Sequence, residues 1–321
     1  MGHDLPVPVI TTSGLTMEFG RQRALDALDV EVESGVTGLV GANGAGKTTL
    51  MSILLGLRPA TSGSATVLGL DPATQGAELR AMVGYGPERN VLPEDMPASD
   101  FVKHLAEVRG MPKDEARGRA SDALWLVGLG EERFRALGSM STGQRQRVKL
   151  AQAIAADPSL IFLDEPTDGL DPVQRDEMLA LIRQISAEYR IDVLLSSHLL
   201  EEVERICDHV IALDAGRLVA HGRLSDLVGN EEGVLVELVD VPDRPGAFAA
   251  VTAALGAAGF EVRPTGRPGV IEVLGLDADL VADAVRDAIV AGEARVRRVV
   301  RRRRRLEDLF DAVGASAGGA A

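Results

Sequence analysis

The chain has 321 residues, of which 45% are hydrophobic and 26% charged, a composition typical of globular proteins and sufficient for two domains. A formal net charge of -14 disfavours non-specific attraction to nucleic acid or anionic lipid. The single cysteine, Cys207, excludes an internal disulfide framework, and no apolar run approaches the ~18 residues that a membrane span needs. We therefore expect that any path across a membrane would be formed by another chain.

The first predicted elements are two strands. The stretch Leu15–Phe19 has strand character, and Ala24–Val32 is a second extended segment after a short turn. Phe19 could stack on a purine ring, because aromatic faces bind bases without fine selectivity. A phenylalanine packed in a sheet core explains this stretch equally well.

A glycine-rich loop follows the apolar run Val36–Val40 and leads into a helix predicted over Leu50–Leu57. Its residues are Gly41, Ala42, Asn43, Gly44, Ala45, Gly46, Lys47, Thr48 and Thr49. This order is that of a P-loop, whose glycines bring backbone N–H groups close to a triphosphate. Lys47 can reach the β- and γ-phosphates, and Thr48 can hold Mg²⁺. Kinases, GTPases, helicases and transport ATPases all have such a loop, so other segments must decide the class.

A helical insert is expected after two further short strands, Gly63–Val67 and Val83–Tyr85. Between about residues 88 and 139, apolar side chains recur at helical spacing. Trp125 lies in this insert among apolar neighbours, and core packing is its expected role.

A second polar turn, Ser141–Gln144, leads directly into a helix predicted over Arg145–Ala156. The N-terminus of a helix offers N–H groups to an anion. The same residues are also explained by Ser141 or Thr142 acting only as an N-cap. On this turn alone, the N-cap is the preferred interpretation.

Two carboxylates, Asp164 and Glu165, close the apolar strand Leu160–Leu163. The first acid can hold the Mg²⁺ and the second can polarise an attacking water. Further along, His198 follows the strand predicted over Ile191–Ser196. A histidine beyond the C-terminal end of a parallel strand is placed to meet a γ-phosphate.

The order of these four elements resembles that of the ATP-binding-cassette (ABC) ATPase family, over about residues 15–229. The resemblance implies an α/β fold with a P-loop NTPase core and a helical insert. The ATP-binding residues it implies are Phe19, Gly41, Asn43, Gly44, Ala45, Gly46, Lys47, Thr48 and Thr49, with Ser141, Gly143 and Gln144 of the signature motif. The catalytic residues it implies are Glu165 as base, His198 as switch histidine, and Lys47. The implied Mg²⁺ ligands are Thr48, Asp164 and Glu88.

Three positions depart from the family pattern. Thr142 replaces a signature glycine, Phe19 stands where a tyrosine is frequent, and Glu88 replaces the Q-loop glutamine. The signature motif keeps Ser141 and Gly143, so ATP binding by this motif is expected to persist. The carboxylate of Glu88 can still join the metal shell, and its charge is a departure from the coupling geometry that the family pattern implies.

The resemblance also implies partners and a cycle. Two subunits close head to tail, so that ATP on the P-loop of one meets the signature helix of the other, and hydrolysis lets them reopen. A separate permease would receive this motion at the insert, and we expect its contact at residues 83–98. The expected location is the cytoplasmic face of the membrane, with no specific nucleic acid as partner.

The composition shifts after residue 229, so we expect a nucleotide-binding domain over residues 1–229 and an accessory domain over residues 230–321. Strands and helices alternate there in the order βαββαβ, a ferredoxin-like pattern. The strands are predicted over Val234–Val239, Phe260–Arg263, Val270–Leu274 and Arg295–Val300, and the helices over Pro245–Ala258 and Ala278–Ala291.

The run Arg301–Arg305 is the unusual local feature of this domain. An anion or nucleic-acid patch is one interpretation. A solvated strand end before a short helix, Leu306–Val313, is preferred. The segment Leu306–Phe310 resembles the terminal motif of ABC subunits from bacterial drug and antibiotic efflux systems, which carry an extension of this length.

The leading hypothesis is therefore the ATPase subunit of an ABC exporter. A second hypothesis is an ABC protein that acts on ribosomes or DNA, which the Arg run favours and the acidic charge, single cassette and single cysteine oppose. A third hypothesis is an import subunit. Such a subunit would typically have a larger β-rich C-terminal domain, which the sequence does not indicate here. The sequence does not indicate which compound is transported, because substrate contacts in this family lie largely in the permease.

Overall fold

The computed structural model describes residues 8–88, 92–228, 232–239, 246–265, 267, 269–275, 278–292, 294–303 and 306–307. The chain divides into two compact units, residues 1–224 and 225–321. The division lies at the start of α8 (Leu224–Val228), whereas the composition shift placed a boundary after residue 229. None of the helices in the described part of the chain is long and apolar enough to cross a membrane.

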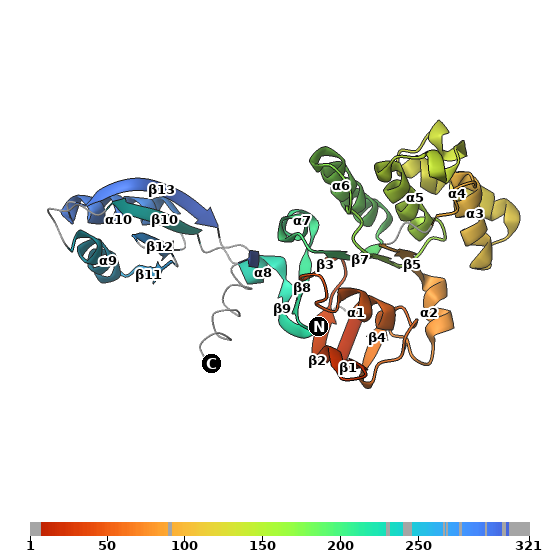
Figure 1. Ribbon diagram of the computed structural model, residues 1–321, viewed down its shortest axis with the longest axis horizontal. Helices are drawn as coiled ribbons and strands as arrows, with labels where there is room; N and C mark the ends of the chain where they lie inside the picture. Colours follow the sequence, from red (N-terminus) through yellow and green to blue (C-terminus); the bar gives the residue numbers. More distant parts are fainter. Residues whose placement is uncertain are drawn as a thin grey trace, which may run out of the picture. The chain divides into compact units, whose positions relative to one another are not determined.

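The first unit contains two sheets (Figure 1). One is antiparallel in the order β2-β1-β4, formed by β1 (Ile10–Phe19), β2 (Gln22–Val32) and β4 (Ser62–Val67). The other has the order β5-β6-β7-β3-β8-β9 and is parallel except for β9. Its strands are β3 (Val36–Val40), β5 (Val83–Gly86), β6 (Leu160–Leu163), β7 (Asp192–Ser197), β8 (His209–Asp214) and β9 (Arg217–Arg223). This confirms the expected α/β class.

The parallel sheet is covered on both faces. On one face, α1 (Lys47–Leu54) and the antiparallel sheet share a hydrophobic core with it, which includes Leu50, Phe162 and Leu194. On the other face lie α5 (Thr142–Ile154), α6 (Pro172–Tyr189) and α7 (Leu200–Ile206) (Figure 1). Every residue of β3 and β6 is buried, as expected for parallel strands between two layers.

The insert consists of α3 (Ala98–Val108), α4 (Lys113–Leu126) and two 3₁₀ turns, Glu131–Phe134 and Leu137–Ser139. The prediction that Trp125 packs in its core is wrong, because 66% of this side chain is exposed. The buried face of α4 is formed instead by Ala116, Ala120, Ala123 and Leu124. Trp125 lies outside this stripe, with the Arg133 guanidinium 5.9 Å from its ring centroid.

Several boundaries differ from the prediction. The P-loop helix runs over Lys47–Leu54 rather than Leu50–Leu57, because it begins directly after Gly46. The first strand starts at Ile10, and the helix after the polar turn starts at Thr142. A short helix, α2 (Gly76–Met82), was not predicted.

The second unit has the expected βαββαβ order. It consists of β10 (Glu232–Val239), α9 (Ala247–Ala257), β11 (Glu261–Pro264), β12 (Val270–Gly275), α10 (Ala278–Ala291) and β13 (Arg295–Arg303). The four strands form an antiparallel sheet in the order β11-β12-β10-β13. Both helices share one apolar core with this sheet, including Val236, Val251 and Val285. Of the helix predicted over Leu306–Val313, only Leu306 and Glu307 lie within the described residues, and both are helical.

Candidate functional site

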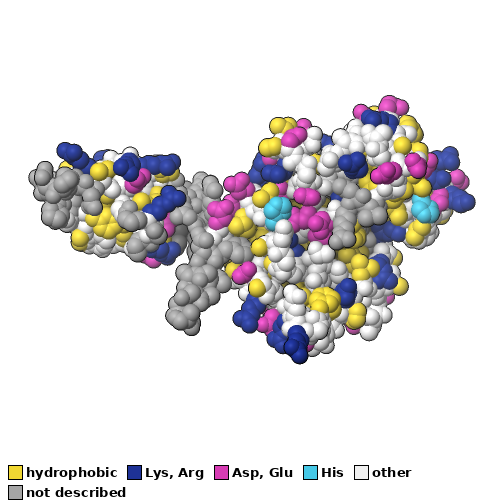
Figure 2. Space-filling view, viewed as in Figure 1, with side chains coloured by type: hydrophobic (Ala, Val, Ile, Leu, Met, Phe, Trp, Pro, Cys, Tyr) yellow, Lys and Arg dark blue, Asp and Glu magenta, His cyan; other side chains and the backbone are white. Residues whose placement is uncertain are grey.

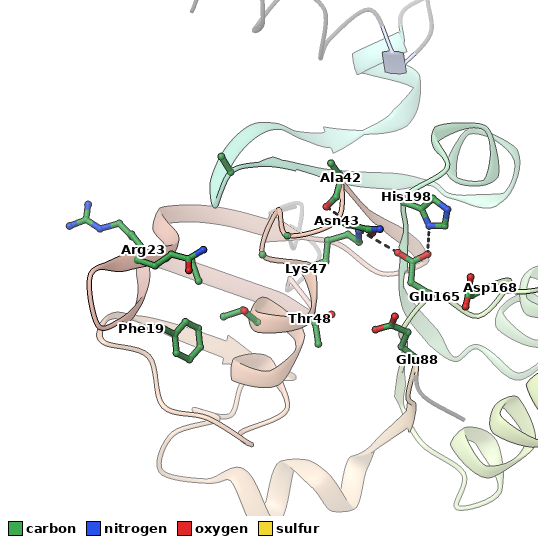
Figure 3. Close-up of a pocket in the computed structure, with 16 residues that line it drawn as sticks. Phe19, Arg23, Ala42, Asn43, Lys47, Thr48, Glu88, Glu165, Asp168 and His198 are labelled. Carbon is green, nitrogen blue, oxygen red and sulfur yellow. Dashed lines mark hydrogen bonds and ion pairs between the residues drawn. The ribbon is translucent and has the colours of Figure 1, made fainter. Parts of the chain in front are cut away.

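A cavity of about 740 Å³ lies in the first unit, beside the P-loop and the ends of β6 and β7. Figure 3 shows Phe19 and Arg23 at one end, Lys47 and Thr48 in the middle, and Glu88, Glu165, Asp168 and His198 at the other end. Ten of the predicted site residues line it: Phe19, Asn43, Gly44, Gly46, Lys47, Thr48, Thr49, Glu88, Glu165 and His198. The carboxyl ends of parallel strands are where ligands bind in open α/β sheets.

The P-loop backbone is suited to a polyphosphate. Gly44 and Gly46 have φ angles of 85° and 106°, which side-chain-bearing residues rarely adopt. A Cβ on Gly46 would lie 2.7 Å from the Ala24 carbonyl oxygen, so only glycine fits there. Gly46 is also the N-cap of α1 and has no side chain to cap it. The N–H groups of the first helical turn are therefore left for an anion, with the favourable end of the helix dipole.

Lys47 connects the loop to the acidic end of the cavity. Its buried Nζ donates to the Gly41 carbonyl at 2.7 Å and lies 3.3 Å from Oε1 of Glu165. The other carboxylate oxygen of Glu165, Oε2, lies 2.8 Å from Nδ1 of His198 (Figure 3). Glu165 is thus held between a cation and an imidazole, and its backbone has the unusual φ of 47°.

Thr48 and Asp164 are also brought together. Thr48 Oγ1 donates to Oδ2 of Asp164 at 3.3 Å, and Ser196 Oγ donates to Oδ1 of Asp164 at 2.6 Å. The same Ser196 oxygen accepts the N–H of Glu165 at 2.9 Å, which fixes both carboxylates at the end of β6. A hydroxyl beside a carboxylate is an oxygen donor set that fits Mg²⁺. No cluster of three or more His, Cys, Asp or Glu suited to a metal occurs among the described residues. Mg²⁺ needs few protein ligands, because water and phosphate oxygens ordinarily complete its coordination.

Phe19 lies at the opposite end of the cavity with 43% of its side chain exposed, so the alternative of a sheet-core phenylalanine is wrong. The Arg58 guanidinium lies over its ring, 5.0 Å from the centroid. Nearby, Arg23 is paired with Glu18 and Asp26, at 2.9 and 2.6 Å.

The predicted signature residues lie apart from this cavity. Ser141, Gly143 and Gln144 are not among its lining residues. Instead, Ser141 Oγ accepts the N–H of Gln144 at 3.2 Å, and the Gln144 side chain accepts the N–H of Ser141 at 3.1 Å. This capping box starts α5. Ser141 is therefore the N-cap of α5, and Ser141, Gly143 and Gln144 lie outside the cavity of their own chain.

Three other predicted residues support the cavity without lining it. Gly41 accepts the Lys47 hydrogen bond, Asp164 contacts Thr48, and Ala45 is buried in the core. Sequence reasoning missed Gln22, Arg23, Ala24, Asp168 and Ala215 in the lining, whereas Ala42 belongs to the predicted P-loop. The sequence could have indicated Asp168 as a lining residue, because it lies three residues after Glu165 in the turn that follows β6.

Lys149 was also missed. It is buried on α5, and its Nζ donates to the carbonyls of Pro87 at 2.8 Å and Glu88 at 3.0 Å. Burial lowers the pKa of Lys149 to about 8, although the charges of Asp168, Asp164 and Glu88 act to raise it.

Comparison with known proteins shows the family to which the chain is similar. The family described as ABC transporter matches residues 25–168. An uncharacterized ABC transporter ATP-binding protein of Synechocystis is 37% identical, over 67% of this chain and 61% of its own length, so the chain spans about three fifths of that relative. The bacitracin transport ATP-binding protein of Bacillus licheniformis is 35% identical, over 66% of this chain and 68% of its own length. The daunorubicin/doxorubicin resistance ATP-binding protein of Streptomyces peucetius is 32% identical, over 78% of this chain and 77% of its own length.

Solved structures give the same fold. The ATP-binding subunit of an ABC transporter is 28% identical, with a TM-score of 0.61 over 68% of this chain and 91% of that one. A dimeric ATP-binding cassette in a post-hydrolysis state, bound to ADP and Pi, has a TM-score of 0.61 over 67% of this chain and 98% of that one. Its identity of 21% supports the shared fold alone.

Proposed function

The chain belongs to the ABC transporter family of ATPases, and from this premise we propose that it powers an exporter whose membrane path is formed by a separate permease. The observation that carries the proposal is the position of Glu165 between Lys47 and His198, beside a P-loop that fits a polyphosphate. Relatives that act in bacitracin transport and in daunorubicin/doxorubicin resistance support export of a drug-like, antibiotic or lipid-like compound.

In this proposal the nucleotide lies along the length of the cavity. Phe19 stacks on the adenine, and the backbone N–H groups of Asn43 to Thr49 bind the phosphates. Lys47 contributes a positive charge that attracts the phosphates. A phosphate oxygen would compete with Glu165 for its Nζ, because both are anions within reach of the same buried ammonium.

Thr48 and Asp164 would hold Mg²⁺, and Glu88 lines the cavity on the same side. When bound, the metal would supply positive charge to the phosphate oxygens. The hydrogen bond from Ser196 keeps Asp164 oriented toward Thr48. Glu88 differs from the glutamine of the family pattern by its charge, so it adds an anion to this end of the cavity.

Glu165 is proposed as the general base for water attack on the γ-phosphate. Its carboxylate is nearly buried, and His198 fixes one of its oxygens at 2.8 Å. Once phosphate replaces it on Lys47, the other oxygen becomes able to accept a proton from water. His198 would then orient Glu165 and sense the phosphate at the end of β7.

The proposal includes a second ABC subunit. Ser141, Gly143 and Gln144 lie at the start of α5 and outside the cavity of their own chain. In a head-to-tail dimer they would close the cavity of the partner, as the family resemblance implies. The first unit would be the nucleotide-binding domain, with its insert over about residues 88–139 contacting the permease, and the second unit an accessory domain. Such an assembly would lie at the cytoplasmic face of the membrane.

The test is a pull-down of the Glu165→Gln variant from gently solubilised cells, with ATP and Mg²⁺ to hold the closed state. Recovery of a polytopic membrane protein is the expected result. Recovery of ribosomes or DNA in its place would overturn the exporter proposal. The Lys47→Ala variant serves as control, because it should not form the ATP-bound state.

A further inference from the structure

A segment of the second unit, residues 295–305, carries a dense positive charge that the proposed ATPase cycle does not use. Residues 295–305 contain eight arginines and no Asp or Glu, in a chain of net charge -14. Six of these arginines belong to β13. Because the Debye length at 0.1 M salt is about 10 Å, this segment acts on a nearby partner through its own charge rather than through the net charge of the chain.

Among the described strands, β13 lies at an edge of its sheet and pairs with β10 alone. Arg295, Arg297 and Arg298 are exposed. Arg297 contacts Glu237 at 2.9 Å, while Arg295 and Arg298 have no ion pair within the described part of the unit. Figure 2 shows basic side chains along the edge of this unit where Figure 1 draws β13.

A second copy of the same strand is a poor partner for this edge. Unpaired edges can add a strand, but antiparallel pairing of β13 with itself would bring arginines opposite arginines. Like charges at that spacing are destabilising. The strand thus resists self-association and is suited to an anionic partner.

The chemistry of the sheet favours a lipid surface over a nucleic acid. None of the strands β10 to β13 contains an aromatic residue, so the sheet offers no platform for stacked bases. Between the arginines, Val299 and Val300 are 47% and 37% exposed. Exposed valines gain nothing from a phosphodiester backbone, but they do at the boundary between lipid headgroups and acyl chains.

We infer that β13 is a docking strand for anionic lipid headgroups, with arginines on the phosphates and valines at the interface. The choice of lipid rests on the proposed function, which puts the chain beside a membrane. Over nine residues the strand is about 30 Å long, so it can contact several headgroups at once. The cassette would then be held at the bilayer by its second unit independently of the permease.

The test is co-flotation of the purified full chain with vesicles of phosphatidylcholine alone or mixed equally with phosphatidylglycerol, at 0.1 M salt. Binding is expected only to the mixed vesicles and should weaken as salt rises. The triple variant Arg295→Glu, Arg297→Glu, Arg298→Glu should lower the partition coefficient by roughly 100-fold, since each arginine near an anionic surface contributes about fivefold.

A matched control reverses three exposed charges on α4 instead, with Lys113→Glu, Arg117→Glu and Arg119→Glu. It has the same net charge as the triple variant and should still bind. Circular dichroism checks that both variants fold, and their basal ATPase should equal that of the parent chain. Because ATPase is assayed without vesicles, failure of lipid binding is distinguishable from failure of the proposed function.

Four outcomes would overturn the inference. The first is equal binding of the parent chain to both kinds of vesicle, and the second is equal loss of binding in the α4 control. The third is tighter retention on duplex DNA of arbitrary sequence than on the mixed vesicles at the same salt, which would make nucleic acid the partner. An absence of binding to either ligand would leave edge protection as the role of the arginines and would also refute the inference.

Discussion

The ammonium of Lys149 donates a 3.0 Å hydrogen bond to the backbone carbonyl of Glu88. This bond connects α5, the helix that starts at Ser141, to the segment that carries Glu88 into the cavity. Helix α5 also packs closely against β5, the strand that precedes this segment, because a Cβ on Gly84 would lie only 2.0 Å from the Ala153 carbonyl oxygen. A shift of α5 would therefore displace Glu88.

The first prediction concerns this connection. In Lys149→Met the carbonyls of Pro87 and Glu88 lose a buried charged donor, and Glu88 is no longer held in place. We expect kcat for ATP to fall by about tenfold while KM stays unchanged, since Phe19 and the P-loop are untouched. Gln152→Met is the control, because Gln152 bonds Tyr85 within β5 rather than the Glu88 segment. A rise in KM without a change in kcat would contradict this role.

The second prediction is a pH dependence of stability. The pKa of Lys149 is lowered by burial to about 8 in the folded chain, from 10.5. Between these values the unfolded chain binds more protons than the folded one, so stability from this group rises as pH increases from 8 to 10.5. The gain should be on the order of 2 kcal/mol.

The measurement is urea unfolding of the parent chain and of Lys149→Met at several pH values. The difference between them isolates Lys149 from Tyr85, whose pKa is raised by burial to about 12 and whose contribution falls with pH above 10. A difference that stays constant from pH 8 to pH 10.5 would show that Lys149 titrates normally.

The order of motifs predicted the α/β core and the cavity, because P-loop chemistry constrains a contiguous stretch of chain from Val36 to Thr49. The same holds for the end of β6, where two carboxylates follow four buried apolar residues. Lys149 could not be found in this way, since its partners lie 61 and 62 positions away and are backbone carbonyls without a sequence signature. The prediction for Trp125 failed for a different reason: Leu124 and Val127 beside it are buried, but its own position lies off the buried stripe of α4.

The third prediction concerns Glu165. In Glu165→Gln the amide cannot accept the proton of the attacking water, so phosphate release should fall by at least about 100-fold. Nucleotide affinity should be kept or should rise, because a neutral side chain competes less for Lys47. Fluorescent ATP-analogue binding and phosphate release measure the two effects separately. Glu177→Gln, at an exposed ion pair with Arg147, should change neither; unchanged turnover in Glu165→Gln would exclude it as the base.

The fourth prediction separates the two roles of Ser141. Ser141→Ala removes the N-cap of α5, which should cost about 1 kcal/mol and lower Tm by about 3 °C. If Ser141 also binds nucleotide across a head-to-tail dimer, ATPase activity at 25 °C should fall by more than tenfold, far beyond this effect on folding. Thr142→Ala does not remove the cap and should keep most activity. A loss of stability with full activity would restrict Ser141 to capping.

The last prediction concerns the expected permease contact. Glu94 and Asp95 are exposed at the entrance to the insert, and their segment is fixed by hydrogen bonds from Gly138 and Leu137 to the carbonyls of Glu94 and Met96. In Glu94→Lys, Asp95→Lys the backbone should be retained while the surface charge reverses. Basal ATPase should therefore persist, and both transport and its stimulation by the permease should be lost in reconstituted vesicles. The control Glu131→Lys, Glu132→Lys makes the same charge change at another exposed turn of the insert and should transport normally. If transport survives in the first variant, the permease contacts another surface, and the exposed Trp125 and Phe134 would be the next side chains to replace.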